Sequence, residues 1–218
     1  MPLDPHVVYN TLLANPSGTL RNYLFRIFGS PDPSGVSAYR LMNRGPSQRP
    51  SSSVGNLKMH DTESFDIRSQ NSIVGVAPAN SFFFNAHSIH MDAGALEMDF
   101  YALGGAGPNI VVTGQLSGCS FIMRPGAAGA VDVAHVRAVD GLAPATLATA
   151  LAHMPNAQVY GGIDTTGNYD FHDREASIIG VRTAGQWVIY AQKQQPDVTG
   201  VHRIKSVYQI WPARVKQG

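Results

Sequence analysis

The chain of 218 residues contains a single cysteine, Cys119, and a thiol is well suited to nucleophilic attack near neutral pH. Gly118 precedes it and allows an unusual backbone conformation and a close approach of substrate. His135 follows sixteen residues later, and an imidazole beside a thiol favours the nucleophilic thiolate. This pattern predicts a cysteine–histidine pair. The alternative is that Cys119 packs as a small apolar residue and His135 is structural.

The elements that must position this pair are mostly strands. Apolar and β-branched runs bounded by glycine- and proline-containing turns predict strands over 95–101, 110–113, 120–123, 131–136, 176–182, 187–192 and 201–211. Gly185 marks the turn of a hairpin. Helices are predicted over 144–154, where Pro144 suits the first turn, and near 5–13. The chain therefore reads as a β-rich α+β protein.

One stretch is rich in serine, proline and glycine. Residues 30–56 predict loops around a short segment at 36–42, with a mobile loop near 43–56. No second core precedes this stretch, so we expect a single catalytic domain over residues 1–218.

The residues around the thiol resemble the active-site motif of the bacterial toxin glutamine deamidases, such as the cytotoxic necrotizing factor catalytic domain and Burkholderia lethal factor. The resemblance rests on Thr113, on Leu-Ser-Gly-Cys at 116–119 and on His135. It implies a β-sandwich-like mixed-sheet core flanked by a few helices. It also implies that Cys119, His135 and Thr113 are catalytic, with backbone support for an oxyanion at Gly118 and Ser117.

The function implied by the resemblance is deamidation of a specific glutamine of a host protein through a thioester. The substrate would be a Rho-type small GTPase or a translation initiation factor. The resemblance further implies a monomeric toxin or effector, secreted or injected into the host cell cytoplasm, that needs no metal or organic cofactor. Three alternatives stay open: transglutamination, a related cysteine hydrolase of the purine-nucleoside-acting kind, and a non-enzymatic interaction domain with a packed cysteine.

Composition argues against other partner classes. Lys+Arg is 16 against 15 for Asp+Glu, and charged residues make up 14% of the chain, where about 25% is usual. Neither a nucleic-acid-binding surface nor a membrane span is predicted, and no Sec-type signal peptide is visible at the N-terminus. His87, His90 and Asp92 could suggest a metal site, but the two histidines of a strand at this spacing face opposite sides. Two polar segments, 30–53 and 164–174, are candidates for reading the substrate.

Overall fold

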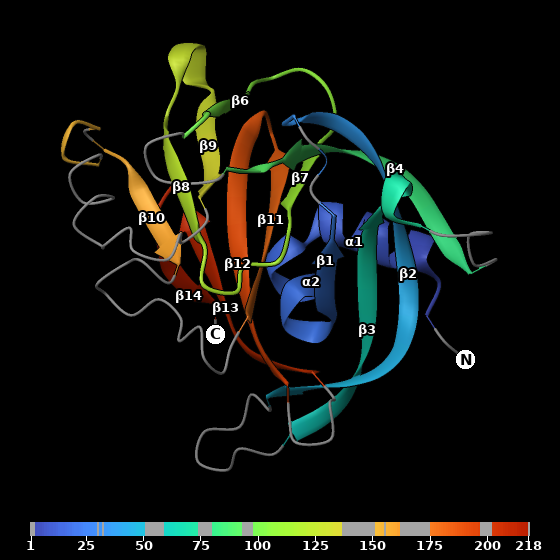
Figure 1. Ribbon diagram of the computed structural model, residues 1–218. Helices are drawn as coiled ribbons and strands as arrows, with labels where there is room; N and C mark the ends of the chain where they lie inside the picture. The colour runs from blue at the N-terminus through green and yellow to red at the C-terminus, as the bar shows by residue number, and fades with distance from the viewer. Residues whose placement is uncertain are drawn as a thin grey trace.

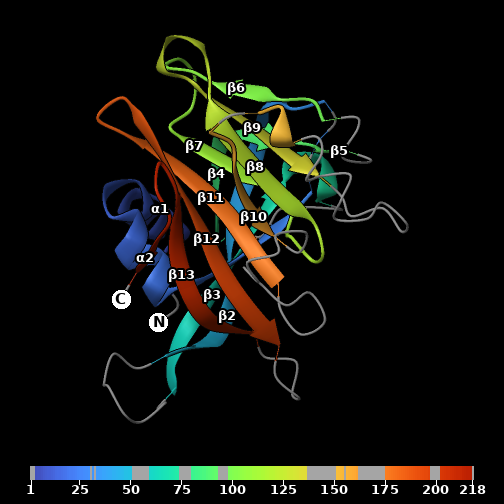
Figure 2. The ribbon, with the colours of Figure 1, turned by 90° about the vertical axis from the view of Figure 1, so that its left-hand side faces the viewer.

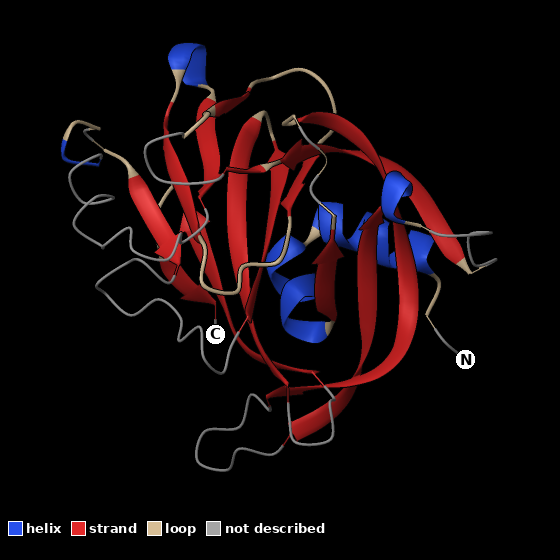
Figure 3. Cartoon of the chain, in the orientation of Figure 1, coloured by secondary structure: helices blue, strands red, loops and turns tan. Residues whose placement is uncertain are grey.

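The computed structural model describes residues 3–29, 31, 33–50, 59–73, 80–92, 98–136, 151–154, 156–161, 175–196 and 202–217. The protein is a mixed α+β chain built mostly from strands (Figure 3). Its described helices are α1 (Pro5–Ala14), α2 (Pro16–Asn22), the 3-10 turns η1 (Gln70–Ser72) and η2 (Ala127–Gly129), and the helical residues 151–152. None of them is long and apolar enough to cross a membrane.

A large sheet of nine strands curls around the helices (Figure 1). Along the sheet the order is β1 (Leu24–Phe28), β3 (Met59–Ser69), β2 (Gly35–Pro50), β4 (Ser81–Ile89), β7 (Ile110–Thr113), β11 (Glu175–Thr183), β12 (Gln186–Pro196), β13 (His202–Trp211) and β14 (Val215–Gln217). An additional pairing joins β2 to β13 at Gln48 and Arg203, so the two halves of the sheet meet.

A smaller sheet lies beside the large one (Figure 2). It contains β10 (Gln158–Gly161), β8 (Ser120–Pro125), β9 (Val131–Val136) and β5 (Met91–Asp92), and β6 (Tyr101–Leu103) also pairs with β9. The chain passes directly from β4 of the large sheet to β5 of the small one through His90. This crossing brings residues 89–91 between the two sheets.

Two apolar clusters form most of the core. The first joins Val8, Leu12 and Leu20 of the helices to Phe25 and Phe65 of the large sheet. Helix α1 forms here because Asp4 accepts a hydrogen bond from the His6 N–H and caps the helix, and Pro5 suits its first turn. The second cluster joins the two sheets, with Ile89, Val111 and Ile189 facing Phe121 and Val133. Cys119 belongs to this second cluster.

The backbone of β1 is held on its open side by side chains rather than by another strand. The N–H of Phe25 donates to Gln192 Oε1 at 2.8 Å, and the Phe25 carbonyl accepts from Ser177 Oγ at 2.7 Å and from Gln194 Nε2. The Gln192 amide also donates to the carbonyls of Leu20 and Tyr23, at 2.5 and 2.7 Å. These contacts satisfy polar groups that burial would otherwise leave unpaired.

Several sequence predictions are confirmed. Strands β7 and β9 have the predicted limits, α1 covers the N-terminal helix, and β11 and β12 form the predicted hairpin. Its turn contains Ala184 and Gly185, both with positive φ (50° and 80°), as a two-residue hairpin turn requires.

Other predictions differ from the structure. Residues 43–50 are not a loop but continue β2, which pairs with β3; a bulge between Asn43 and Gly45, where Gly45 has φ 94°, accommodates the Gly-Pro sequence. Residues 98–100 are not a strand, and β6 begins only at Tyr101. The predicted helix 144–154 lies outside the described residues except at its end, where 151–152 are helical.

Candidate active site

Cys119 and His135 lie on one face of two adjacent antiparallel strands. In β8 and β9, Phe121 pairs with His135, and Cys119 immediately precedes β8. Side chains of a strand alternate between faces. Because Cys119 packs in one cluster with Phe121 and Val133, it lies on the face that also carries His135, a diagonal neighbour across the two strands.

The turn before the thiol is shaped by glycine. Gly118 has φ 96°, in the left-handed region where a side chain would be strained, and Ser117 beside it is exposed. The turn is anchored by Leu116, whose N–H and carbonyl exchange hydrogen bonds with Ala176 at 2.8 and 3.0 Å. The predicted roles of Ser117 and Gly118 as backbone support are therefore compatible with their position next to the thiol.

Thr113 holds the imidazole, and the contacts define which ring nitrogen carries the proton. Thr113 Oγ1 lies 2.8 Å from the carbonyl of Ile89 and 2.6 Å from His135 Nδ1. A carbonyl only accepts, so the single hydroxyl proton goes to Ile89 and the oxygen accepts from Nδ1–H. A neutral His135 therefore carries its free lone pair on Nε2, the arrangement that a general base needs.

His135 is held in its neutral form. The side chain is 1% exposed. Burial, with a smaller contribution from the charge of His90, lowers the pKa of His135 from 6.5 to about 4. Its Nε2 is buried and makes no hydrogen bond within the described part of the chain. A buried nitrogen without a partner is uncommon in folded proteins.

The thiol contacts a thioether. Cys119 Sγ lies 3.5 Å from Met91 Sδ, and Met91 is paired with His135 in the parallel β5–β9 ladder. Cys119 is 7% exposed. In this conformation the thiol is directed to Met91, and no hydrogen bond joins it to His135 Nε2.

Strand β10 closes the site behind the nucleophile. Gly161 pairs with Ser120 and has φ 154°. A Cβ atom on Gly161 would lie 2.4 Å from the Cys119 carbonyl oxygen and 2.5 Å from Ser120 Cα, which are backbone atoms that cannot move aside freely. Only glycine allows this approach.

The sequence interpretation missed the supporting residues Ile89, Met91 and Gly161. The histidines of segment 87–92 indicated only a possible metal site. What the segment contributes to the candidate active site is the Ile89 carbonyl, the Met91 sulfur and the charge of His90. His87 turns to Tyr101 instead, with its Nδ1 2.9 Å from the phenol oxygen. Over the residues that the structure describes, no group of three or more His, Cys, Asp or Glu is placed to hold a metal ion.

The candidate substrate-reading segments are only partly described. Residues 35–50 of the first segment form β2, and 164–174 lie outside the described residues. A scan against models of protein families and a search of curated proteins both find no match to this chain.

Proposed function

We propose that this protein is a thiol-dependent protein-glutamine deamidase. The observation that supports it is the arrangement of Cys119, His135 and Thr113. Cys119 and His135 share one face of the adjacent strands β8 and β9, and Thr113 of β7 orients the imidazole so that Nε2 is the basic nitrogen. A nucleophile, a base and a group that orients the base are the components of cysteine-dependent acyl transfer.

The chemistry follows from these atoms. Cys119 transfers its proton to His135 Nε2 as Sγ attacks the carbon of the glutamine carboxamide. The imidazolium then protonates the nitrogen, the C–N bond breaks and ammonia leaves, with the acyl group held as a thioester on Sγ. Neutral His135 next accepts a proton from water, whose oxygen attacks the thioester. Glutamate is released and the thiol is restored.

The tertiary contacts add a requirement to this scheme. Since His135 is neutral at pH 7 and the thiol contacts Met91, proton transfer must accompany attack on the substrate rather than precede it. We assign a rotation of Cys119 from Met91 toward Nε2 to the step in which the substrate carboxamide enters. The turn at Ser117 and Gly118 is assigned to the developing oxyanion.

We further propose the finer fold and the biological setting that the resemblance to the bacterial toxin glutamine deamidases implies. The packing of the small sheet on the large one through a shared apolar cluster supports a β-sandwich-like core. The substrate would be a host small GTPase of the Rho type or a translation initiation factor, reached by a secreted or injected toxin or effector. The chain would act as a monomeric catalytic domain over residues 1–218.

The test is glutamine deamidation by the intact protein. Incubation with host-cell lysate should produce a protein with one glutamine converted to glutamate, a gain of about one mass unit, detected by peptide mass spectrometry. Cys119→Ser should reduce conversion at least about 1,000-fold while leaving the thermal unfolding midpoint close to wild type. A folded Cys119→Ser protein that retains full activity would exclude the thioester mechanism.

One observation favours a second candidate, a non-enzymatic domain with a packed cysteine. Cys119 is 7% exposed and belongs to the apolar cluster between the sheets. That candidate predicts a thiol inert to iodoacetamide in the native protein and no converted glutamine. An active protein whose activity is lost on alkylation of Cys119 would exclude it.

A further inference from the structure

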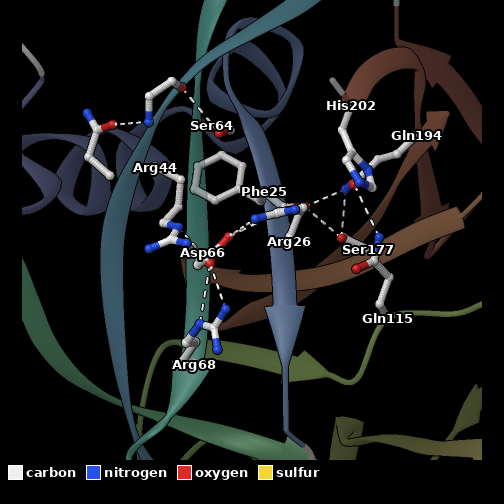
Figure 4. A network of polar contacts seen from close by, with 12 residues as sticks. Phe25, Arg26, Arg44, Ser64, Asp66, Arg68, Gln115, Ser177, Gln194 and His202 are labelled. Carbon is white, nitrogen blue, oxygen red and sulfur yellow. Dashed lines mark hydrogen bonds and ion pairs between the residues drawn. The ribbon is translucent and has the colours of Figure 1, made fainter. Parts of the chain in front are cut away.

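Three arginines surround one buried carboxylate on the large sheet. Asp66 of β3 is fully buried and bridges Arg26 of β1 at 2.9 Å, Arg68 of β3 at 3.1 Å and Arg44 of β2 at 3.2 Å. Figure 4 shows Asp66 at the centre of these side chains. We refer to Arg26, Arg44, Arg68 and Asp66 as the arginine cluster.

The cluster holds its guanidinium groups in fixed places. Arg26 reaches Asp66 Oδ1 through both Nε and Nη2, and Arg68 reaches Oδ2 through the same pair of nitrogens. The ring of Phe28 lies 5.3 Å from the Arg26 guanidinium carbon and 4.3 Å from that of Arg68. Forked bonds on one side and an aromatic ring on another leave these groups little freedom to reorient.

The charge of the cluster is not balanced internally. Three guanidinium charges face one carboxylate charge, an excess of two positive charges in a chain whose formal net charge is +1. The side chains of Arg44, Arg68 and Arg26 are 48%, 30% and 23% exposed. One arginine is enough to pair a buried aspartate, so a stabilising role for Asp66 does not by itself account for three.

The cluster is connected to the loop that carries the nucleophile. Gln115 Nε2 donates to Gln194 Oε1 at 3.2 Å, and Gln194 Nε2 donates to the carbonyl of Phe25, the residue before Arg26. Gln115 also donates to Glu175 at 2.5 Å, and the charge of Arg26 is one of the causes that lower the pKa of His202, after burial itself. Figure 4 shows Gln115 and His202 beyond Arg26, on the side away from Asp66.

The cluster also lies away from the helices. Phe25, Ile27, Phe65 and Ile67 face the helical core, so the alternating residues Arg26, Asp66 and Arg68 face the other side of the sheet. A ligand can reach these guanidinium groups without displacing α1 or α2.

We propose that the arginine cluster docks an acidic segment of the protein substrate, on the nucleophile-loop side of the large sheet. This inference rests on the proposed function, because the acidic segment would belong to the same substrate protein whose glutamine Cys119 attacks. Asp66 already takes the Nε and Nη2 pair of Arg26 and of Arg68, whereas its ion pair with Arg44 uses Nε. A guanidinium presents a second pair of N–H groups, on its two terminal nitrogens, which can bind a carboxylate with two parallel hydrogen bonds. A nucleic acid is the less suitable occupant, because two excess charges supply only a small part of the counterion release that drives such binding.

The test separates binding from turnover. Cys119→Ala protein is titrated into a fluorescein-labelled peptide with a central glutamine between runs of glutamate, and into a matched peptide with serine in place of every glutamate. At low salt the acidic peptide should bind at least about tenfold more tightly. Adding Arg44→Glu, at the most exposed member of the cluster, should weaken acidic-peptide binding by about tenfold.

The matched control is Arg21→Glu. It makes the same change of charge at an exposed position on α2, whose buried residue Leu20 packs on the other face of the sheet. It should leave acidic-peptide binding within about twofold. The docking proposal would be overturned if Arg44→Glu and Arg21→Glu had equal effects on binding, or if the protein showed no preference for the acidic peptide. It would also be overturned if an oligothymidylate bound with the same dependence on Arg44.

Ammonia release by the wild-type chain keeps the two proposals distinguishable. Deamidation of both peptides with no effect of Arg44→Glu on binding overturns the docking surface and supports the deamidase. Arg44-dependent binding of the acidic peptide, with no converted glutamine in peptide or host lysate, supports the docking surface and contradicts the deamidase.

Discussion

Two buried polar networks of this protein differ in how completely their polar atoms are hydrogen-bonded. The β1 network, made by Gln192, Gln194, Ser177 and the Phe25 backbone, uses its amide and hydroxyl groups to pair the edge of a strand. The His135 network, made by Ile89, Thr113 and His135, is equally buried but leaves His135 Nε2 without a hydrogen bond in the described structure. A paired network stabilises the chain, whereas an unpaired buried nitrogen costs stability, and in the mechanism that we propose this nitrogen is the atom that accepts the thiol proton.

The largest expected effect is the acid sensitivity of the His135 network. The pKa of His135 is about 6.5 in the unfolded chain and about 4 in the folded protein. As pH falls from 6.5 to 4, the unfolded state therefore binds a proton that the folded state does not yet bind. Wild-type stability should therefore fall by about 3 kcal/mol more than that of His135→Gln over this interval. Above pH 6.5 the two curves should run parallel.

Urea unfolding at a series of pH values measures this difference. Because His87 and His202 also have lowered pKa values through burial, the comparison with His135→Gln isolates the contribution of His135. Parallel curves down to pH 4 would show that His135 is not the acid-sensitive group.

The next effect belongs to the β1 network. Gln192→Leu should lower the free energy of unfolding by about 2–3 kcal/mol, because it leaves the Phe25 N–H and the Leu20 and Tyr23 carbonyls without partners. Gln209→Leu is the control, since the Gln209 amide contacts the Ala213 carbonyl in an exposed position and should change stability by about 0.5 kcal/mol at most. If both variants lose the same stability, burial is not what makes the β1 network important.

A smaller effect on stability, and a clear one on activity, is expected at Thr113. Thr113→Val keeps the shape but removes the oxygen that accepts from His135 Nδ1, so kcat should fall by about 10- to 100-fold. Thr113→Ser should retain most activity. Nitrogen NMR of the histidine ring supplies a readout that packing alone would not change: wild type should show the Nδ1–H tautomer and Thr113→Val a mixture.

The smallest effect is expected at Met91. Met91→Leu conserves side-chain volume and should alter stability by less than about 1.5 kcal/mol. It removes the sulfur that contacts Cys119 Sγ, so alkylation of Cys119 by iodoacetamide should become about two- to threefold faster. Met91→Ala is no substitute for this test, because it opens a cavity. Slower alkylation in Met91→Leu would mean that Met91 assists the thiol rather than restraining it.

The sequence predicted the members of the candidate site better than their surroundings. A single thiol after a glycine, with an imidazole sixteen residues further on, is a local pattern that indicates Cys119 and His135, whereas Thr113 is indicated only by the resemblance to the bacterial toxin glutamine deamidases. Ile89 and Met91 leave no such signal, since their contribution is one carbonyl and one contact made across two sheets. The sequence around Gly161 does not indicate that its backbone closely approaches Cys119.

The fold was predictable where local patterning is strong. Alternating or β-branched runs located β7 and β9, and Gly185 located a hairpin turn. The second half of β2 was not recognised because its composition is that of a loop, and its strand conformation comes from pairing with β3 and from the bulge at Gly45. Tertiary pairing overrides composition in such segments.

By itself, the sequence determined that one thiol is present, that glycine precedes it, and that Thr113 and His135 lie within sixteen residues of it along the chain. Only the tertiary structure decided that His135 is neutral, that Nε2 is its basic nitrogen, and that the thiol contacts Met91. It also decided that Asp66 gathers three arginines from three strands. The physical reason is that protonation and pairing depend on burial and on distances of a few ångströms, which sheet pairing sets between residues far apart in the chain.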